Sequence, residues 1–228
     1  MKVTTDACLF GAWTGEKVGS QESIVDSWES GVRKILDIGA GTGLLSLMLA
    51  QKTKALIDSI EIDRDAFEQA KENISASPWK ERIHIYHADA AEFSFSSKYD
   101  VIISNPPFYE NELRPPDEKK NIAHHGGLPL QQLLSIIKNN LSEEGLFFLL
   151  LPHKRNEEAE RLINSNDLSI VQKILVSQSV KHDHFRIMIE GSCKKDKKMI
   201  VDEISIRNEQ QQYTGKFIDL LKDYYLHL

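Results

Sequence analysis

The 228-residue sequence has few cysteines, no long apolar run and more acidic than basic residues. Its two cysteines, Cys8 and Cys193, stand far apart, so they form no disulfide framework and suit a reducing compartment. The apolar runs are too short to cross a bilayer, and the first residues lack the basic-then-apolar layout of a signal peptide. We therefore expect a cytoplasmic protein without a membrane anchor.

The formal net charge of −6 argues against binding to nucleic acid by bulk electrostatics. Basic residues nevertheless gather in two short stretches, 181–186 (KHDHFR) and 194–198 (KKDKK). A nucleic-acid partner would therefore be met on a local patch, although the second stretch also reads as a solvated turn. The candidate patch residues are Lys181, Arg186, Lys194 and Lys195.

The sequence also lacks a convincing metal site. Two histidine pairs, His124-His125 and His182-x-His184, invite such an interpretation. Neither pair comes with a glutamate-bearing helix or with spaced cysteines, which the common zinc motifs require. We therefore expect no metal, and histidines that face solvent or RNA.

Apolar runs alternate with helical periodicity from residue 33 onward, a pattern typical of repeated βα units and a parallel sheet. Strands are predicted at 33–39, 55–62, 82–88, 99–104, 145–152, 168–177, 184–191 and 200–207, and helices at 42–53, 65–76, 130–141, 157–164 and 214–225. The stretch 109–127 has no period and is rich in charge, Pro and Gly, which predicts a functional or mobile loop. With no linker or repeat, we expect one α/β domain over 1–228, with an N-terminal segment (1–32) before a Rossmann-like core (33–228).

A glycine-rich turn, DIGAGTG, joins the first predicted strand to the first helix. Gly39, Gly41 and Gly43 permit a tight turn and let a ligand lie against bare backbone at a helix N-terminus. Glu61 ends the next strand, where a carboxylate accepts hydrogen bonds from ribose hydroxyls in open α/β sheets. The pattern predicts a nucleotide-like cofactor; the alternatives are a turn that binds nothing and a NAD fingerprint with imperfect spacing.

The DxGxGxG pattern beginning at Asp37 resembles motif I of class I S-adenosyl-L-methionine-dependent methyltransferases. The resemblance implies S-adenosyl-L-methionine as cofactor and a seven-stranded, mostly parallel sheet with one late antiparallel strand and helices on both faces. It also implies that Asp89, after the third strand, faces the adenine amine; the alternative for Asp89 is a helix cap. The cofactor-binding residues expected from it are Asp37, Gly39, Gly41, Gly43, Glu61, Ile62, Asp89, Ala90 and Asn105.

The stretch NPPFY follows the fourth predicted strand. In the fold implied, Asn105 lies beside the transferable methyl group. Its side-chain oxygen and the Pro106 carbonyl are two acceptors that match the two N–H groups of an exocyclic amine. Pro107 stiffens the corner, and Phe108 or Tyr109 offers a ring for stacking on a flat base. The alternative is a proline-rich turn with an Asn cap.

Further stretches, MKVTTDACLFGAW, IISNPPFY and the C-terminal DYYLHL among them, resemble the bacterial tRNA(1)Val adenine-37 N6-methyltransferase family. The resemblance implies methylation of N6 of the adenosine beside the anticodon of a tRNA. It also implies that Lys2, Thr5 and Asp6 lie near the methionine end of the cofactor, which the segment 1–32 covers; the alternative is a frayed polar terminus. That family carries a short aromatic and basic segment before this motif, so either this lineage lacks it or, as we expect, the sequence begins too late.

Other functions share the Asn-Pro-Pro-aromatic corner. It occurs in methyltransferases that act on adenine in DNA or RNA, on guanine N2 and on protein glutamine. The alternatives to a tRNA methyltransferase are therefore a release-factor-type glutamine methyltransferase, a DNA adenine methyltransferase, and a module that binds cofactor or RNA without turnover. The first usually has an extra N-terminal helical domain and the second a target-recognition domain, and neither domain is apparent here.

Overall fold

A computed structural model describes residues 3–24, 33–107, 128–194 and 198–227, without the side chains of 21–24. The strands are β1 (Lys34–Ile38), β2 (Leu56–Glu61), β3 (Ile83–His87), β4 (Tyr99–Ser104), β5 (Leu141–Pro152), β6 (Ser169–Ser179), β7 (His184–Ser192) and β8 (Ile200–Arg207). The helices are α1 (Thr5–Ile24), α2 (Leu44–Lys52), α3 (Arg64–Ser75), α4 (Leu130–Asn140), α5 (Asn156–Ser165) and α6 (Gly215–Leu221), with short 3-10 helices η1 (Lys80–Arg82) and η3 (His153–Arg155). The whole of the predicted loop 109–127 lies outside the described residues.

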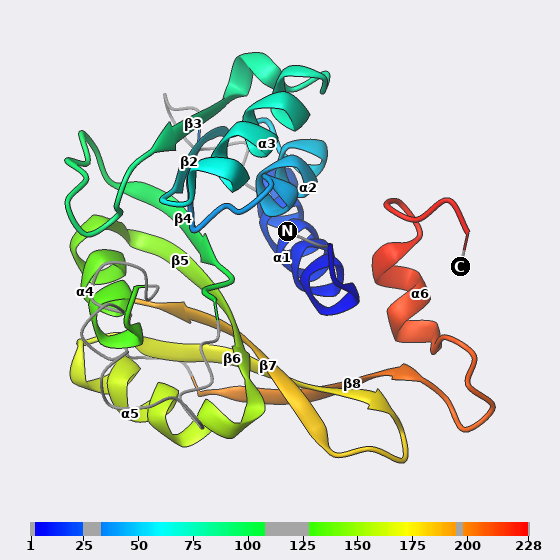
Figure 1. The fold of residues 1–228 in the computed structure, drawn as a ribbon. Coiled ribbons are helices and arrows are strands. Elements are labelled where there is room, and N and C mark those ends of the chain that lie inside the picture. Colours follow the sequence, from blue (N-terminus) through cyan, green and yellow to red (C-terminus); the bar gives the residue numbers. More distant parts are fainter. Residues whose placement is uncertain (1–2, 25–32, 108–127, 195–197, 228) are drawn as a thin grey trace, which may run out of the picture.

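The strands of the described ranges form one sheet in the order β3-β2-β1-β4-β5-β7-β6-β8 (Figure 1). Only β7 runs antiparallel to its neighbours in these pairings, which confirms the mostly parallel sheet with one late antiparallel strand. The expected number of seven strands is wrong by one, because β8 pairs in parallel with β6 at the edge. Alternate β8 residues, Ile204 and Ile206, are buried in the core, and this burial stabilises the strand at the edge of the sheet.

Helices cover both faces of the sheet, as expected (Figure 1). Residues of α1, α2 and α6 share one apolar cluster, and residues of α4 and α5 share another. Consecutive strand residues alternate between the two clusters: Ile35 belongs to the first and Leu36 to the second, and Phe148 and Phe147 divide in the same way. The C-terminal helix is shorter than predicted, since α6 ends at Leu221.

The N-terminal segment is a long buried helix, α1, which the sequence pattern did not predict. Its central residues are buried on all sides, so it has no polar face to reveal helical periodicity. Glycines also lower its intrinsic helix propensity. They serve packing: a Cβ at Gly11 would lie 2.6 Å from Met48 Sδ, and one at Gly15 would lie 2.8 Å from the Tyr224 hydroxyl. The glycines thus let α1 approach α2 and the C-terminal residues closely.

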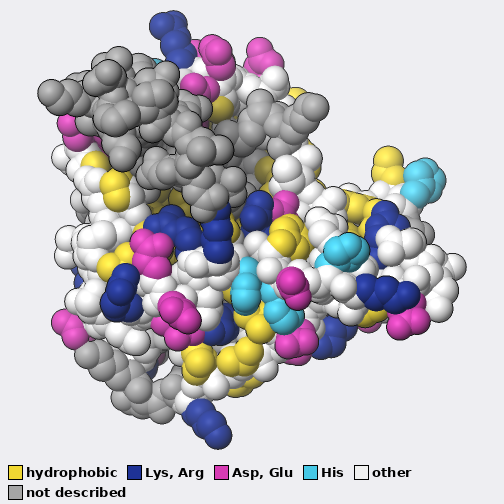
Figure 2. Space-filling model, turned by 60° about the horizontal axis from the view of Figure 1, so that its bottom comes forward, with side chains coloured by type: hydrophobic (Ala, Val, Ile, Leu, Met, Phe, Trp, Pro, Cys, Tyr) yellow, Lys and Arg dark blue, Asp and Glu magenta, His cyan; other side chains and the backbone are white. Residues whose placement is uncertain are grey.

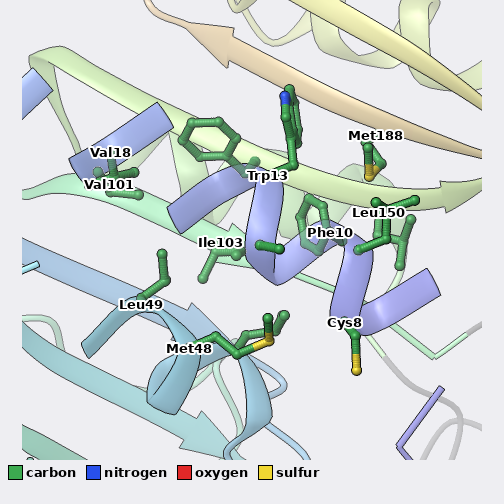
Figure 3. Close-up of a cluster of buried hydrophobic side chains, with 14 of the residues drawn as sticks. Cys8, Phe10, Trp13, Val18, Met48, Leu49, Val101, Ile103, Leu150 and Met188 are labelled. Carbon is green, nitrogen blue, oxygen red and sulfur yellow. The ribbon is translucent and has the colours of Figure 1, made fainter. Parts of the chain in front are cut away.

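Aromatic side chains of α1 fill the core between helix and sheet. Figure 3 shows Phe10 and Trp13 among Ile103 and Leu150 of the sheet. The Trp13 ring stands edge-on to Phe148, with ring centroids 5.5 Å apart, a favourable aromatic geometry. The helix α1 is therefore part of the main core, and this packing fixes the position of its first turn.

A glycine in β7 offers a test of this core. Gly191 pairs with Phe147, and a Cβ there would lie 2.1 Å from the Phe147 ring and 2.7 Å from the Ser169 carbonyl oxygen. Because Phe147 is fully buried, we expect Gly191→Ala to lower the free energy of unfolding by about 1–3 kcal/mol, the usual cost of overpacking. Urea denaturation measures it. The control is Gly215→Ala, where a Cβ meets nothing within 4 Å; equal stability of the two variants would contradict the packing described.

The described ranges contain neither a candidate membrane span nor a candidate metal site. None of their helices combines the length and apolarity that a membrane span needs. Among the same residues, no group of three or more His, Cys, Asp or Glu is arranged to hold a metal ion.

Candidate active site

The predicted site residues converge on one edge of the sheet. The strands β3, β2, β1 and β4 are parallel neighbours, so their carboxyl ends lie side by side. The glycine loop follows β1, Glu61 ends β2, Asp89 follows β3 and Asn105 follows β4. These four predicted places therefore lie at the same edge of the sheet, and the roles assigned to their residues stay predictions. Such a carboxyl edge is the usual ligand site of an open α/β sheet.

The glycine loop has the backbone geometry that only glycine adopts easily. Gly39, Gly41 and Gly43 have φ values of 73°, 58° and 81°. The N–H groups of Gly39 and Ala40 both donate to the Ile60 carbonyl, which ties the loop to β2. A Cβ built on Gly39 meets no atom within 4 Å, so the space above this residue is open. The loop therefore presents bare backbone to an open space at the start of α2.

Glu61 holds the loop in place. Its Oε2 accepts the Gly41 N–H at 2.7 Å, and its Oε1 accepts the Asp63 N–H at 2.8 Å. The residue is only 6% exposed. Because each carboxylate oxygen has two lone pairs, one acceptor position remains on each for a ligand hydroxyl. The carboxylate is thus oriented by the protein before any ligand arrives.

Asp37 lies behind the loop and is fully buried. Its Oδ2 accepts the Ser46 hydroxyl at 2.7 Å, and Ser46 Oγ lies 2.7 Å from Ser59 Oγ, whereas Oδ1 has no partner among the described atoms. Burial raises the pKa of the Asp37 carboxyl to about 7; the charge of Glu61 adds to the rise, and hydrogen bonds from Ser46 oppose it. These contacts join β1, β2 and α2 beneath the loop. The predicted contact of Asp37 with the cofactor stays a prediction.

Three further predicted residues line the same edge beside Glu61. Ile62 is 57% exposed although apolar, and Ala90 is buried. Asp89 is half-buried, and its Oδ1 accepts the Ala91 N–H at 2.8 Å. This is the capping contact of the alternative interpretation, although it closes a turn and not a helix. An exposed apolar side chain beside carboxylates suits a flat, polar-edged ligand.

His87 supports this part of the site, and sequence analysis missed it. Its Nε2 donates to the Ile62 carbonyl at 3.1 Å, and its ring stacks on Phe67 with centroids 5.2 Å apart. His87 also pairs in register with Glu61. The signal available in the sequence was its place at the end of the third strand, directly before Ala88-Asp89.

Asn105 contributes an acceptor without a donor. Ser104, the last residue of β4, donates its hydroxyl to the Ile38 carbonyl at 2.7 Å and so fixes the end of β4 against β1. The next side chain, Asn105, has its Oδ1 buried with no hydrogen-bond partner in the described residues. A buried acceptor left unpaired costs about 1–3 kcal/mol. This cost is removed when a ligand N–H donates to Oδ1. Pro106 is buried and Pro107 exposed.

Some predicted residues lie outside the described ranges. They are Lys2, Phe108, Tyr109, His124, His125 and Lys195. The predicted stacking of Phe108 or Tyr109 on a base therefore stays a prediction, as does the place of Lys2 near the cofactor.

The first turn of α1 is anchored at the same edge. Asp6 Oδ2 accepts from Arg186 Nε at 2.8 Å. Arg186 pairs in register with Pro152, the last residue of β5, so this ion pair lies at the carboxyl ends of the strands. Thr5, the first residue of α1, is exposed there. Arg186, expected to contact RNA, is thus engaged with Asp6.

Two described residues of the predicted basic patch, Lys181 and Lys194, do not lie together. Lys194 forms an ion pair with Glu144, close to the amino end of β5. Lys181 follows β6, which is parallel to β5 because both run antiparallel to β7, so Lys181 lies at the carboxyl edge. The two lysines therefore lie at opposite edges of the sheet and do not share one surface.

Comparisons with known proteins agree with this geometry. Residues 10–154 match the model of the family described as "Methyltransferase small domain". Proteins called "tRNA1(Val) (adenine(37)-N6)-methyltransferase" from Dyadobacter fermentans and Flavobacterium johnsoniae are each 36% identical to this chain. The alignments cover 99% and 94% of this chain and 91% and 94% of those proteins. A protein of that name from Photorhabdus laumondii is 34% identical over 100% of this chain and 89% of its own length.

Solved structures share the fold. A predicted O-methyltransferase, Atu636 from Agrobacterium tumefaciens, superposes with a TM-score of 0.68 at 14% identity, covering 94% of this chain and 95% of that one. The glycopeptide N-methyltransferase MtfA, complexed with S-adenosyl-L-methionine, gives a TM-score of 0.56 at 10% identity, covering 81% and 94%. The predicted Rossmann-like class I methyltransferase fold is thereby confirmed.

Proposed function

Because the chain belongs to the tRNA1(Val) (adenine(37)-N6)-methyltransferase family, we propose that it transfers a methyl group from S-adenosyl-L-methionine to N6 of adenosine 37 in tRNA1(Val). The observation that carries the proposal is the buried, unpartnered Oδ1 of Asn105 at the carboxyl edge beside the glycine loop. That atom needs an N–H donor, and adenine N6 has two. We propose that the reaction takes place in the cytoplasm, where tRNA is available.

The residues at the carboxyl edge fit the proposed cofactor. The open space above Gly39 admits a ligand against bare backbone at the start of α2. Glu61 keeps acceptor positions for ribose hydroxyls, and Asp89 is an acceptor for the adenine amine. Ile62 and Ala90 supply apolar surface for the adenine ring. When bound, S-adenosyl-L-methionine supplies an electrophilic methyl group on a sulfonium.

Asn105 and Pro106 position the nucleophile. The Asn105 side-chain oxygen and the Pro106 carbonyl accept the two N6–H groups, which aims the nitrogen lone pair at the methyl carbon. This lone pair is otherwise delocalised into the adenine ring. The bound cofactor would supply the methyl group, and N6, on gaining it, would release a proton to water. A strong base is not required, because the amine becomes acidic only as it accepts the methyl group.

We also propose that residues 1–32 cover the cofactor site as part of a single domain, 1–228. The Asp6–Arg186 ion pair supports this, since it holds the first turn of α1 against the carboxyl end of β5. Thr5 then lies at the carboxyl edge, near the end of β5, the strand beside β4. Lys2 is proposed to lie nearby.

The carboxylate of Glu61 provides a test of the cofactor site. Glu61→Gln keeps the side-chain shape but replaces one acceptor oxygen by an N–H donor, which then faces a backbone N–H. We expect the cofactor Kd to rise about 10–100-fold, the worth of one or two hydrogen bonds to a charged group. Isothermal titration calorimetry measures it. Glu68→Gln, an exposed residue of α3, is the matched control, and equal Kd values for the two variants would contradict the role of Glu61.

The experiment for the function is incubation with labelled S-adenosyl-L-methionine and, in parallel, tRNA1(Val) and a release factor with a methylatable glutamine. Digestion of the tRNA should give N6-methyladenosine as the labelled nucleoside. Label in the release factor alone would replace the proposal by protein glutamine methylation. Cofactor binding with label in neither substrate would favour a non-catalytic module.

A further inference from the structure

We propose that a basic surface at the carboxyl edge of the sheet binds the phosphate backbone of the RNA substrate; this inference rests on the proposed function. We name it the η3–β7 surface. Its residues are His153, Lys154 and Arg155 of η3, Lys181 and His182 after β6, and His184 of β7.

The η3–β7 surface joins two segments that are separate in the sequence. His153 follows the last residue of β5, while His184 begins the antiparallel strand β7, so both lie at the same end of the sheet. Their rings are 5.4 Å apart between centroids. Figure 2, which brings the bottom of Figure 1 forward, shows Lys, Arg and His side chains on this side of the molecule, with Asp and Glu side chains between them.

The surface lies next to the corner that is proposed to hold the amine. The strand β5, which leads into η3, is the parallel neighbour of β4, which leads into Asn105. A base held at Asn105 would therefore have its flanking phosphates near η3. The η3–β7 surface runs along the edge from η3 to the turn after β6, in the strand order β5-β7-β6. It can therefore contact successive phosphates of one RNA strand.

Acidic residues near this surface do not prevent phosphate binding. Arg155 is paired with Glu158 through Nε at 2.7 Å, and His184 Nε2 lies 3.8 Å from Glu203 Oε1. Both pairs are partly exposed, and pairs exposed to solvent contribute little because water and salt screen them. A phosphate makes charge-assisted hydrogen bonds and releases counterions from the RNA on binding. It can therefore compete with these carboxylates for the same side chains.

The chain offers a matched control at the opposite edge of the sheet. Lys80 is an exposed lysine in η1, a 3-10 helix of the same length as η3. It precedes β3 and so lies at the amino edge, whereas Lys154 follows β5 at the carboxyl edge. Lys80→Ala and Lys154→Ala thus remove the same charge from similar local structures at opposite edges.

The experiment measures the Kd of an unmodified tRNA1(Val) transcript at several KCl concentrations for the full chain and for Lys154→Ala, Lys181→Ala and Lys80→Ala. We expect Lys154→Ala and Lys181→Ala each to weaken binding about 3–10-fold and to reduce the slope of log K against log salt by about 0.7–0.9, as for one lost phosphate contact. Lys80→Ala should bind like the unchanged chain. The cofactor Kd should be the same in all four proteins.

Failure of this inference is distinguishable from failure of the proposed function. If the unchanged chain methylates tRNA1(Val), and Lys154→Ala and Lys181→Ala bind it with the Kd and salt slope of Lys80→Ala, the η3–β7 surface is overturned and the function stands. If the unchanged chain neither binds nor methylates the tRNA, both are overturned. If Lys154→Ala instead impairs methylation of a protein glutamine, the surface docks protein, and the RNA assignment is wrong.

Discussion

Asn105→Ala is expected to lower kcat for methyl transfer about 10²–10³-fold, the loss seen when one preorganised hydrogen-bonding group is removed from an active site. The alanine leaves N6 with one acceptor, the Pro106 carbonyl, so the amine is no longer held in line with the methyl group. The Kd for the cofactor should change less than threefold, because the main cofactor contacts proposed lie on the glycine loop, Glu61 and Asp89. Single-turnover rates with tRNA1(Val) measure the loss.

A second readout separates this role from a structural one. Since the Asn105 Oδ1 is buried without a partner in the described residues, its removal should not lower stability. The matched control is Asn164→Ala on the exposed side of α5. A large fall in thermal stability with Asn105→Ala, or a kcat equal to that of the control, would contradict the proposed role. Such a trade of stability for activity is common at active sites.

Asp37→Asn is expected to change how the stability depends on pH. The pKa of the carboxyl rises from 3.8 to about 7 on folding, because burial disfavours its charged form. Between these values the unfolded chain is ionised at this group and the folded chain is not, so the stability that the group contributes is lost as pH rises from about 4 to 7. A shift of about three units corresponds to about 4 kcal/mol. Asparagine does not titrate, so the variant lacks this loss.

The measurement is the free energy of unfolding of both proteins at several pH values from 4 to 8. The difference, Asp37→Asn minus the unchanged chain, should increase with pH by up to about 4 kcal/mol and level off above pH 7. Taking the difference cancels the other titrating groups. Parallel pH profiles for Asp37→Asn and the unchanged chain would refute a raised pKa of the buried carboxyl beneath the loop.

The sequence was informative wherever local pattern and position along a strand determine structure. The apolar runs of β1 to β5 are flanked by turn residues, which made these strands predictable. Parallel strands bring their carboxyl ends together, so the sequence also predicted that the glycine loop, Glu61, Asp89 and Asn105 lie at one edge of the sheet. The N-terminal helix was missed because its apolar residues lie on all sides and its glycines lower helix propensity. Its stability depends on packing against α2 and α6, which no local pattern reports.

Contacts between segments that are distant in the sequence could not be predicted from it. Asp6 and Arg186 form an ion pair although they stand near opposite ends of the sequence, so no local pattern predicts their contact. Lys181 and Lys194 are close in number, but β7 lies between them and carries them to opposite edges of the sheet. In the same way, Asp37 precedes the glycine loop in the sequence, yet its side chain turns inward to Ser46.

The most direct test of the account is transfer of labelled methyl to tRNA1(Val) and to the same tRNA with guanosine at position 37. We expect label in the adenosine form alone, recovered as N6-methyladenosine, because the Asn105 corner accepts from the amine of that one base. Equal labelling of the two tRNAs would contradict the assignment of adenosine 37. Labelling of neither would contradict the proposed function itself.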